Sequence, residues 1–112
     1  MRLWFVETHS FTKRVTHLGL EEDLRGLQED LLANPEAGAT DAGTGGLRKL
    51  RMAASSRGKG KRGGARVHYL WLSAHGVVYL LFVYGKDDQD ILDSMQKRQL
   101  KRVVEMIKAE WS

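Results

Sequence analysis

The chain has 112 residues, 42% of them hydrophobic, which suits one domain over residues 1–112 with a single core. It contains no cysteine, which excludes disulfides, thiol catalysis and cysteine-bound zinc. No apolar run reaches the length of about 18 residues that a membrane span needs. The apolar patch near the N-terminus is too short for a signal peptide, so we expect a cytoplasmic protein.

The net charge of +4 is distributed unevenly along the chain. Residues 1–41 hold four Lys or Arg against eight Asp or Glu, and residues 87–112 hold five against six. Between them, residues 42–86 hold nine Lys or Arg and no acid. Such segregation predicts a surface for a polyanion, and nucleic-acid backbone is the commonest polyanion in a cell.

The N-terminal part of the chain predicts one strand followed by two helices. Residues 3–6 are a short apolar run typical of a strand. Apolar side chains three and four apart then predict a helix that ends at Gly19, with Thr8 or Ser10 as its N-cap. Leucines at the same spacing predict a second helix over residues 20–32, with acids in its first turn. We expect these helices to form an antiparallel hairpin with an acidic outer surface.

The remainder predicts three strands and a C-terminal helix. Residues 36–46 are small and glycine-rich, which favours an exposed loop, and residues 54–64 read as a flexible basic loop. The predicted order is β-α-α-β-β-β-α, an α+β fold with a compact antiparallel sheet. The strands are expected over residues 47–53, 66–73 and 77–84, and the last helix over residues 95–111.

Basic side chains are expected on one face of this sheet. Lys49 and Arg51 alternate with apolar residues and therefore project the same way, and Arg66 and His68 do the same from the next strand. Paired guanidinium groups on a rigid sheet grip phosphate in a forked geometry that lysine does not reproduce. The loop over residues 54–64 can add four more cations above this face: Arg57, Lys59, Lys61 and Arg62.

His68 is the natural proton-transfer group of this face, because its ordinary pKa lies near neutrality. Neighbouring cations would disfavour its charged form, which suits a base, whereas a histidine packed inside the sheet is the structural alternative. No acid lies among these cations, which argues against a nuclease with two metal ions. The acids at 87–90 are expected to cap a helical turn rather than to hold a cation, so we expect neither a metal nor a cofactor.

Three strings, in this order, resemble the HigB group of the RelE toxin superfamily: GGLRKLR at residues 45–51, RGKGKRGGAR at residues 57–66 and YGKDD at residues 84–88. The resemblance runs over nearly the whole chain. It implies a RelE-like fold and the toxin half of a bacterial type II toxin–antitoxin pair. Such toxins enter the ribosomal A site and cut messenger RNA through the RNA's own 2′-hydroxyl, without a metal.

The resemblance also implies roles for individual residues. Lys49 and Arg51 look like the paired basic residues of the family's central strand, and Arg66 looks like the arginine that opens the next one. Lys86 stands beside a position where the family often has an arginine, although here that position is Asp87. The C-terminal tyrosine of the best-known member has no counterpart after Tyr84. The general base therefore stays open among His68, Tyr84 and a loop lysine, and Arg48 joins the loop cations and Tyr84 as an expected RNA contact.

The implied partners are the 70S ribosome with its messenger RNA and a helix-turn-helix antitoxin similar to HigA, through which alone the toxin would reach operator DNA. Three other functions remain open. The first is a non-catalytic RNA- or ribosome-binding module. The second is a toxin-like protein that only binds DNA or antitoxin and has lost cleavage, and the third is a metal-dependent nuclease that acts on naked RNA.

Overall fold

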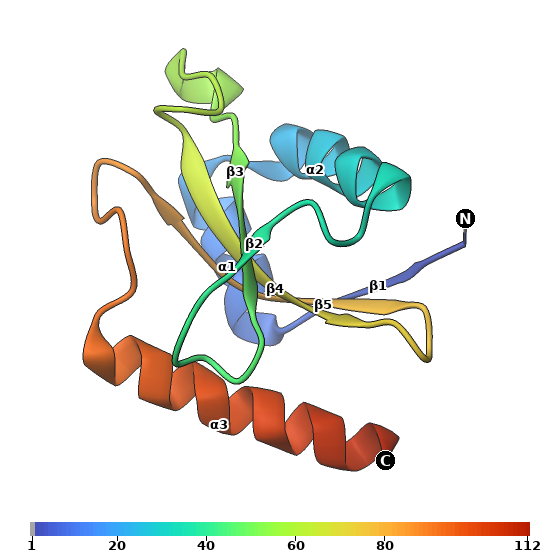
Figure 1. Cartoon of the computed structure of the whole chain (residues 1–112). Coiled ribbons are helices and arrows are strands. Elements are labelled where there is room, and N and C mark those ends of the chain that lie inside the picture. The colour runs from blue at the N-terminus through green and yellow to red at the C-terminus, as the bar shows by residue number, and fades with distance from the viewer. Residues whose placement is uncertain (1) are drawn as a thin grey trace.

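The computed structural model of the chain describes residues 2–112 (Figure 1). The predicted elements are all present, within two residues of their predicted ends, and one short strand and a 3-10 turn are added. In chain order they are β1 (Trp4–Glu7), α1 (His9–Leu18), α2 (Glu21–Ala33), β2 (Ala39–Thr40), β3 (Arg48–Met52), the 3-10 helix η1 (Ser55–Arg57), β4 (Ala65–Leu72), β5 (Val77–Gly85) and α3 (Ser94–Trp111).

The helix ends follow the local sequence. Of the two candidate caps for α1, Thr8 is the one used, because its hydroxyl accepts a hydrogen bond from the backbone N–H of Phe11. Gly19 ends α1 in the left-handed region at φ 68°, which a residue with a side chain rarely adopts. Asp93 caps α3 and exchanges side-chain and backbone hydrogen bonds with Gln96 in a capping box.

The sheet has five strands in the order β1-β5-β4-β3-β2. The prediction of a purely antiparallel sheet is wrong at one edge, because β1 runs parallel to β5. The other pairs are antiparallel as predicted. The turn over residues 73–76 forces β4 and β5 to run antiparallel, whereas β1 reaches β5 with most of the chain between them, so no tight turn dictates its direction.

The glycine-rich segment over residues 36–46 is mostly exposed, as its composition predicts, but two of its residues are buried and two form a strand. Residues 39–40 form β2 against β3, and Gly38 is buried so close to β3 that a Cβ there would lie 2.7 Å from the Lys49 carbonyl oxygen. Thr44 is also buried, with its hydroxyl donating to the carbonyl oxygen of Asp41 at 2.6 Å. Small residues here allow the segment to pack against the sheet.

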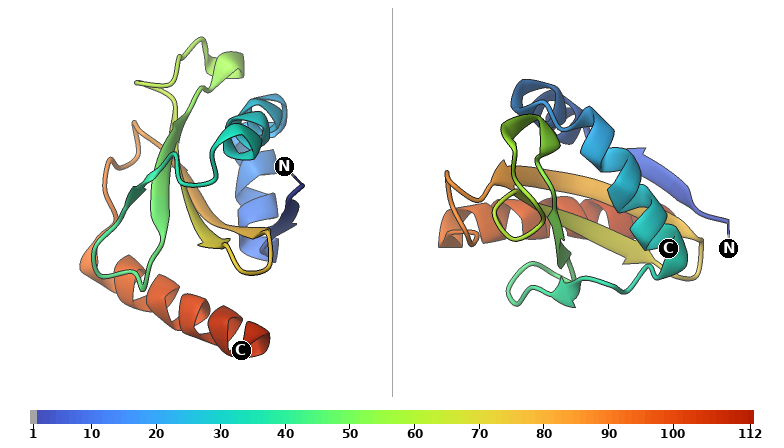
Figure 2. Two further views of the ribbon diagram at one scale, coloured as in Figure 1. Left: turned by 45° about the vertical axis from the view of Figure 1, so that its right-hand side comes forward. Right: turned by 90° about the horizontal axis from the view of Figure 1, so that it is seen from above.

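Helices cover both faces of the sheet (Figures 1 and 2). α1 and α2 pack on one face, where their apolar side chains meet those of β3, β4 and β5 in the main core. α3 packs on the other face through a smaller core that includes Leu70, Leu81, Val104 and Ile107. None of the helices within residues 2–112 is long and apolar enough to cross a membrane.

The two N-terminal helices do not form the predicted antiparallel hairpin. α1 packs along β5. The chain changes direction at Gly19, and α2 runs across the direction of α1 instead of back alongside it (Figures 1 and 2). The reason is that each helix buries its own apolar stripe on a different part of the sheet: Phe11 and Val15 from α1, and Leu24, Leu27 and Leu31 from α2.

Candidate functional site

The strand register gathers the predicted basic residues on one face of the sheet. Lys49 in β3 lies opposite His68 in β4, and Arg51 lies opposite Arg66. Residues directly opposite each other in an antiparallel pair project from the same face. Tyr84 in β5 lies opposite Arg66 and therefore joins them. We call this set of five side chains the basic face; it shares its side of the sheet with α3.

The members of the basic face differ sharply in exposure. Arg51 is exposed and Lys49 is half-buried, so both are open to a ligand. Arg66 is only 4% exposed and His68 is fully buried. Tyr84 is also fully buried, so three of the five side chains are covered. The sequence predicted the shared face but not this burial.

Arg66 serves in this structure as an anchor for the chain around it. Its guanidinium donates to the carbonyl oxygens of Arg62 at 3.0 Å, of Ala65 at 3.3 Å and of Lys61 at 3.4 Å. Its Nη2 also lies 3.4 Å from Oδ1 of Asp90. The arginine thus holds the end of the basic loop onto β4.

His68 and Tyr84 form a buried pair, with His68 Nε2 3.0 Å from the Tyr84 hydroxyl oxygen. Burial is the main reason that the pKa of His68 falls from 6.5 to about 4; Asp41 opposes this shift and Lys49 and Lys97 add to it. Burial also raises the pKa of Tyr84 to about 12. At neutral pH the pair is therefore a neutral imidazole hydrogen-bonded to a neutral phenol, and the imidazole tautomer decides which of the two donates.

Asp41 is a residue of the site that the sequence reading missed. Its Oδ2 lies 3.4 Å from Nδ1 of His68, and its Oδ1 lies 3.7 Å from Nζ of Lys97 at the start of α3. His68 Nδ1 has no hydrogen-bond partner within residues 2–112, so Asp41 acts on it through charge across a short gap. The one signal for it in the sequence was its position, because Asp41 is the acid directly before residues 42–86, which contain no acid.

Acids that come directly after β5 in the chain also contact the basic residues. Residues 87–90, which we call the acidic turn, were expected to cap a helical turn. The backbone N–H groups of Asp88 and Gln89 do form a turn on the Gly85 carbonyl oxygen, at 3.0 and 3.3 Å, but the acid that caps α3 is Asp93. Asp87 pairs with Lys59 at 2.6 Å, and Asp90 reaches Arg66. Gln89 exchanges two amide hydrogen bonds with Gln96, at 2.8 and 3.2 Å, which ties the acidic turn to α3.

The basic loop is folded rather than flexible. Ser55 and Arg57 bound the short helix η1, and the backbone N–H and hydroxyl of Ser55 both donate to the Asp23 carboxylate on α2. Lys61 pairs with Asp30 of α2 at 3.2 Å. The acids of α2 thus hold the loop from the opposite side of the sheet, a long-range contact that local composition does not predict.

The remaining expected RNA contacts do not all join the basic face. Arg48 lies on the opposite face of β3, where it pairs with Glu36 at 3.2 Å. Lys86 is half-buried just after β5, and its backbone N–H donates to the Gly64 carbonyl oxygen. Among the nine cations of residues 42–86, those without an ion pair in the described part of the chain are Lys49, Arg51, Arg57, Arg62 and Lys86.

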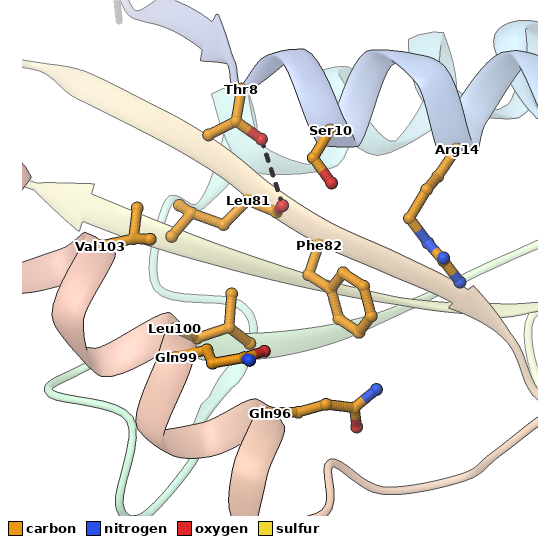
Figure 3. Close-up of a pocket in the computed structure, with 9 residues that line it drawn as sticks. All are labelled: Thr8, Ser10, Arg14, Leu81, Phe82, Gln96, Gln99, Leu100 and Val103. Carbon is orange, nitrogen blue, oxygen red and sulfur yellow. Dashed lines mark hydrogen bonds between the residues drawn. The ribbon is translucent and has the colours of Figure 1, made fainter.

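A separate cavity of about 420 Å³ lies between α1 and α3, beside Leu81 and Phe82 of β5 (Figure 3). Arg14 lies 4.8 Å from the centre of the Phe82 ring and donates from Nε to the Val83 carbonyl oxygen at 2.6 Å. Leu100 and Val103 face it from α3. Nothing in the sequence reading pointed to this cavity, because the two helices that line it are far apart in the chain.

No group of three or more His, Cys, Asp or Glu within residues 2–112 is placed to hold a metal ion. The arrangement of the basic face is suited to binding an anion, with a neutral histidine and a tyrosine beside the cations. A comparison with protein-family models finds no model that matches this chain.

Proposed function

We propose that this protein is a RelE/HigB-type toxin that cuts messenger RNA in the ribosomal A site and so inhibits translation. The single observation that carries the proposal is the register that puts Lys49 and Arg51 opposite His68 and Arg66 on one side of the sheet. The resemblance of the three basic strings supports it further. On this proposal the partners are the 70S ribosome, its messenger RNA and a helix-turn-helix antitoxin, and the protein works in the cytoplasm.

In the proposed reaction the 2′-hydroxyl of the RNA gives its proton to a base and attacks the adjacent phosphorus. The bond to the 5′-oxygen breaks, that oxygen takes a proton from solvent and leaves as a hydroxyl, and a cyclic phosphate remains. Lys49, Arg51 and Arg66 would stabilise the charge that develops on the phosphate oxygens. His68 is neutral at physiological pH and is the candidate to take the proton from the 2′-hydroxyl. The ribosome would supply the alignment of sugar and phosphate by presenting the codon.

A second function is favoured by the burial of the two groups that chemistry would need most. Since Arg66 is 4% exposed and His68 is fully buried, the surface as it stands offers RNA only the cations around them. Such a surface fits a non-catalytic RNA- or ribosome-binding module. The two functions differ in whether messages are cut.

The test is expression of the chain from an inducible promoter, with growth and message cleavage followed by primer extension. Wild type is expected to stop growth and to cut translated messages. Lys49→Ala/Arg51→Ala is expected to relieve both effects and to bind RNA at least about tenfold more weakly, because each cation neutralises phosphate charge.

A matched control is Lys13→Ala/Arg25→Ala, which removes the same charge from exposed positions on α1 and α2 and is expected to remain toxic. RNA binding without cleavage by the wild type would favour the non-catalytic module. Cleavage of naked RNA that EDTA abolishes would point instead to a metal-dependent nuclease.

A further inference from the structure

Another cavity, of about 300 Å³, lies where the turn between β4 and β5 meets the C-terminal end of α3 (Figures 1 and 2). Three aromatic side chains line it, Trp71, His75 and Trp111, together with Lys108. None of the described residues that line it is Asp or Glu. Its volume lies at the lower end of the range of about 300 to 1,000 Å³ that is usual for ligand sites.

The indole of Trp111 is held in position and is still accessible. Its Nε1 donates to the Tyr79 hydroxyl oxygen at 2.9 Å, and its ring centre lies 4.6 Å from that of His75, with the two planes at 45°. Trp111 is nevertheless 37% exposed, and His75 is exposed as well. An aromatic ring that is already fixed loses little side-chain entropy when another flat ring stacks on it.

Lys108 places a cation beside these aromatic rings. Its Nζ donates to the Gly45 carbonyl oxygen at 2.8 Å and pairs with no acid within residues 2–112. A lysine ammonium has three N–H donors, so this contact leaves donors for a phosphate. α3 as a whole carries five Lys or Arg against two Glu, so its surface favours an anionic ligand.

Lys108 is also one end of a row of lysines along α3. Lys97, Lys101 and Lys108 are four and seven residues apart, spacings that place them on one side of a helix. At the other end of the row, Lys97 Nζ lies 3.7 Å from Oδ1 of Asp41, the acid next to His68. With a rise of 1.5 Å per residue, the row is roughly 17 Å long. It therefore leads from the basic face to the aromatic cavity.

We propose that this cavity is a base-binding subsite for single-stranded RNA, in which Trp111 and His75 stack one nucleobase and Lys108 contacts its phosphate. The lysine row then carries the strand between this subsite and the basic face. The inference rests on the proposed function in one respect, because it takes RNA as the ligand. It adds a contact that is remote from the phosphate to be cut.

A nucleobase with its phosphate is the ligand that uses every part of this cavity. Stacking on aromatic side chains together with cations along the backbone is the usual way in which proteins hold single strands. An aliphatic ligand would leave Lys108 unused, and a free phosphate would leave the aromatic rings unused. Because every base has a flat face, the subsite is expected to accept all four bases.

The first test is an NMR titration of the protein with AMP, followed through the indole Nε1–H signals. AMP is expected to shift the signal of Trp111 in a saturable way and to leave that of Trp4, which is 69% exposed on β1, in place. Ribose 5-phosphate carries the same phosphate without a base. It is expected to leave the Trp111 signal in place, because stacking and not charge moves it.

The second test measures binding of a single-stranded RNA with 2′-O-methyl groups, which prevent cleavage, at fixed salt. Trp111→Ala is expected to bind about tenfold more weakly, because stacking of one base contributes about 1 to 3 kcal/mol. Trp111→Phe keeps an aromatic ring and is expected to stay within about threefold of wild type. Trp4→Ala removes an exposed tryptophan outside the cavity and is the matched control.

His75→Ala keeps the test valid if Trp111→Ala folds poorly, because His75 is exposed in the turn between β4 and β5. It is expected to bind RNA about threefold more weakly, as part of the stacking surface is lost. Equal loss of affinity in Trp111→Ala and Trp111→Phe would mean that the indole only supports the fold, which would overturn the inference.

The two proposals fail in different ways. If AMP shifts Trp111 but the expressed chain neither stops growth nor cuts messages, the subsite stands and the toxin function fails. If the wild type cuts messages while AMP leaves Trp111 unmoved and Trp111→Ala binds RNA as Trp4→Ala does, the inference is wrong and the toxin function is untouched.

Discussion

His68 is the residue whose protonation most affects this structure. It is fully buried, and its Nε2 is hydrogen-bonded to the Tyr84 hydroxyl. Its pKa is about 4 in the folded chain against an ordinary value of 6.5. Above pH 6.5 the imidazole is neutral in both the folded and the unfolded chain. Below that value the unfolded chain takes up a proton that the folded chain refuses until about pH 4.

We therefore predict that the free energy of unfolding falls as pH is lowered from about 6.5 towards about 4. Between about pH 7.5 and about pH 5 the contribution of His68 is about 2 kcal/mol. Urea unfolding at both pH values measures it. His68→Gln is expected to lose this part of the pH dependence, and His9→Gln, at an exposed position, is expected to keep it. Equal pH dependence in both variants would show that His68 is not buried neutral.

At the scale of elements, side chains of the sheet hold the irregular segments in place. The buried hydroxyl of Tyr69 donates to the Pro35 carbonyl oxygen at 2.8 Å and accepts from the Gly38 backbone N–H at 3.0 Å. This tyrosine fixes the chain between α2 and β2, and through it the approach to Asp41. Tyr79 makes a comparable but exposed contact, since its hydroxyl accepts from Trp111 Nε1 at 2.9 Å.

We predict that Tyr69→Phe lowers the free energy of unfolding by about 1 to 3 kcal/mol, because it leaves buried backbone groups without partners. Tyr79→Phe removes an exposed hydrogen bond and is expected to cost about 0.5 kcal/mol, because water replaces the lost partner. Chemical denaturation of the two variants gives the comparison. A larger loss in Tyr79→Phe would contradict the assigned role of Tyr69.

At the scale of the whole molecule, the charge asymmetry of the sequence is partly cancelled by folding. Four of the cations in residues 42–86 pair with acids from outside that stretch: Arg48 with Glu36, Lys59 with Asp87, Lys61 with Asp30 and Arg66 with Asp90. These pairs are largely exposed on the acid side, so each adds little stability. Their main effect is to determine which cations stay unpaired.

We predict that RNA affinity depends on salt through the unpaired cations. For single-stranded RNA, the logarithm of the binding constant falls as the logarithm of the salt concentration rises. The slope of this plot is expected to become shallower by about 0.7 for each phosphate contact removed. Lys49→Ala/Arg51→Ala should therefore flatten the slope by roughly 1.4 if each residue contacts one phosphate. Lys13→Ala/Arg25→Ala should leave the slope unchanged, and a parallel change in both double variants would exclude a defined cationic site.

The sequence by itself determined every element except β2 and η1, and the face on which Lys49, Arg51, Arg66 and His68 meet. Apolar spacing of three and four residues predicts a helix, and alternation predicts a strand, because these periods follow from backbone geometry alone. The alternation of side chains along two neighbouring strands was therefore sufficient to place these four side chains on one face.

Only the tertiary structure decided which of those side chains are covered. Arg66 and His68 are buried and lie 3.4 Å from Asp90 and Asp41, acids that are distant from them in sequence. The parallel pairing of β1 with β5 and the divergence of α1 from α2 have the same origin. Contacts between distant segments are set by how the whole core packs, and no local pattern encodes that.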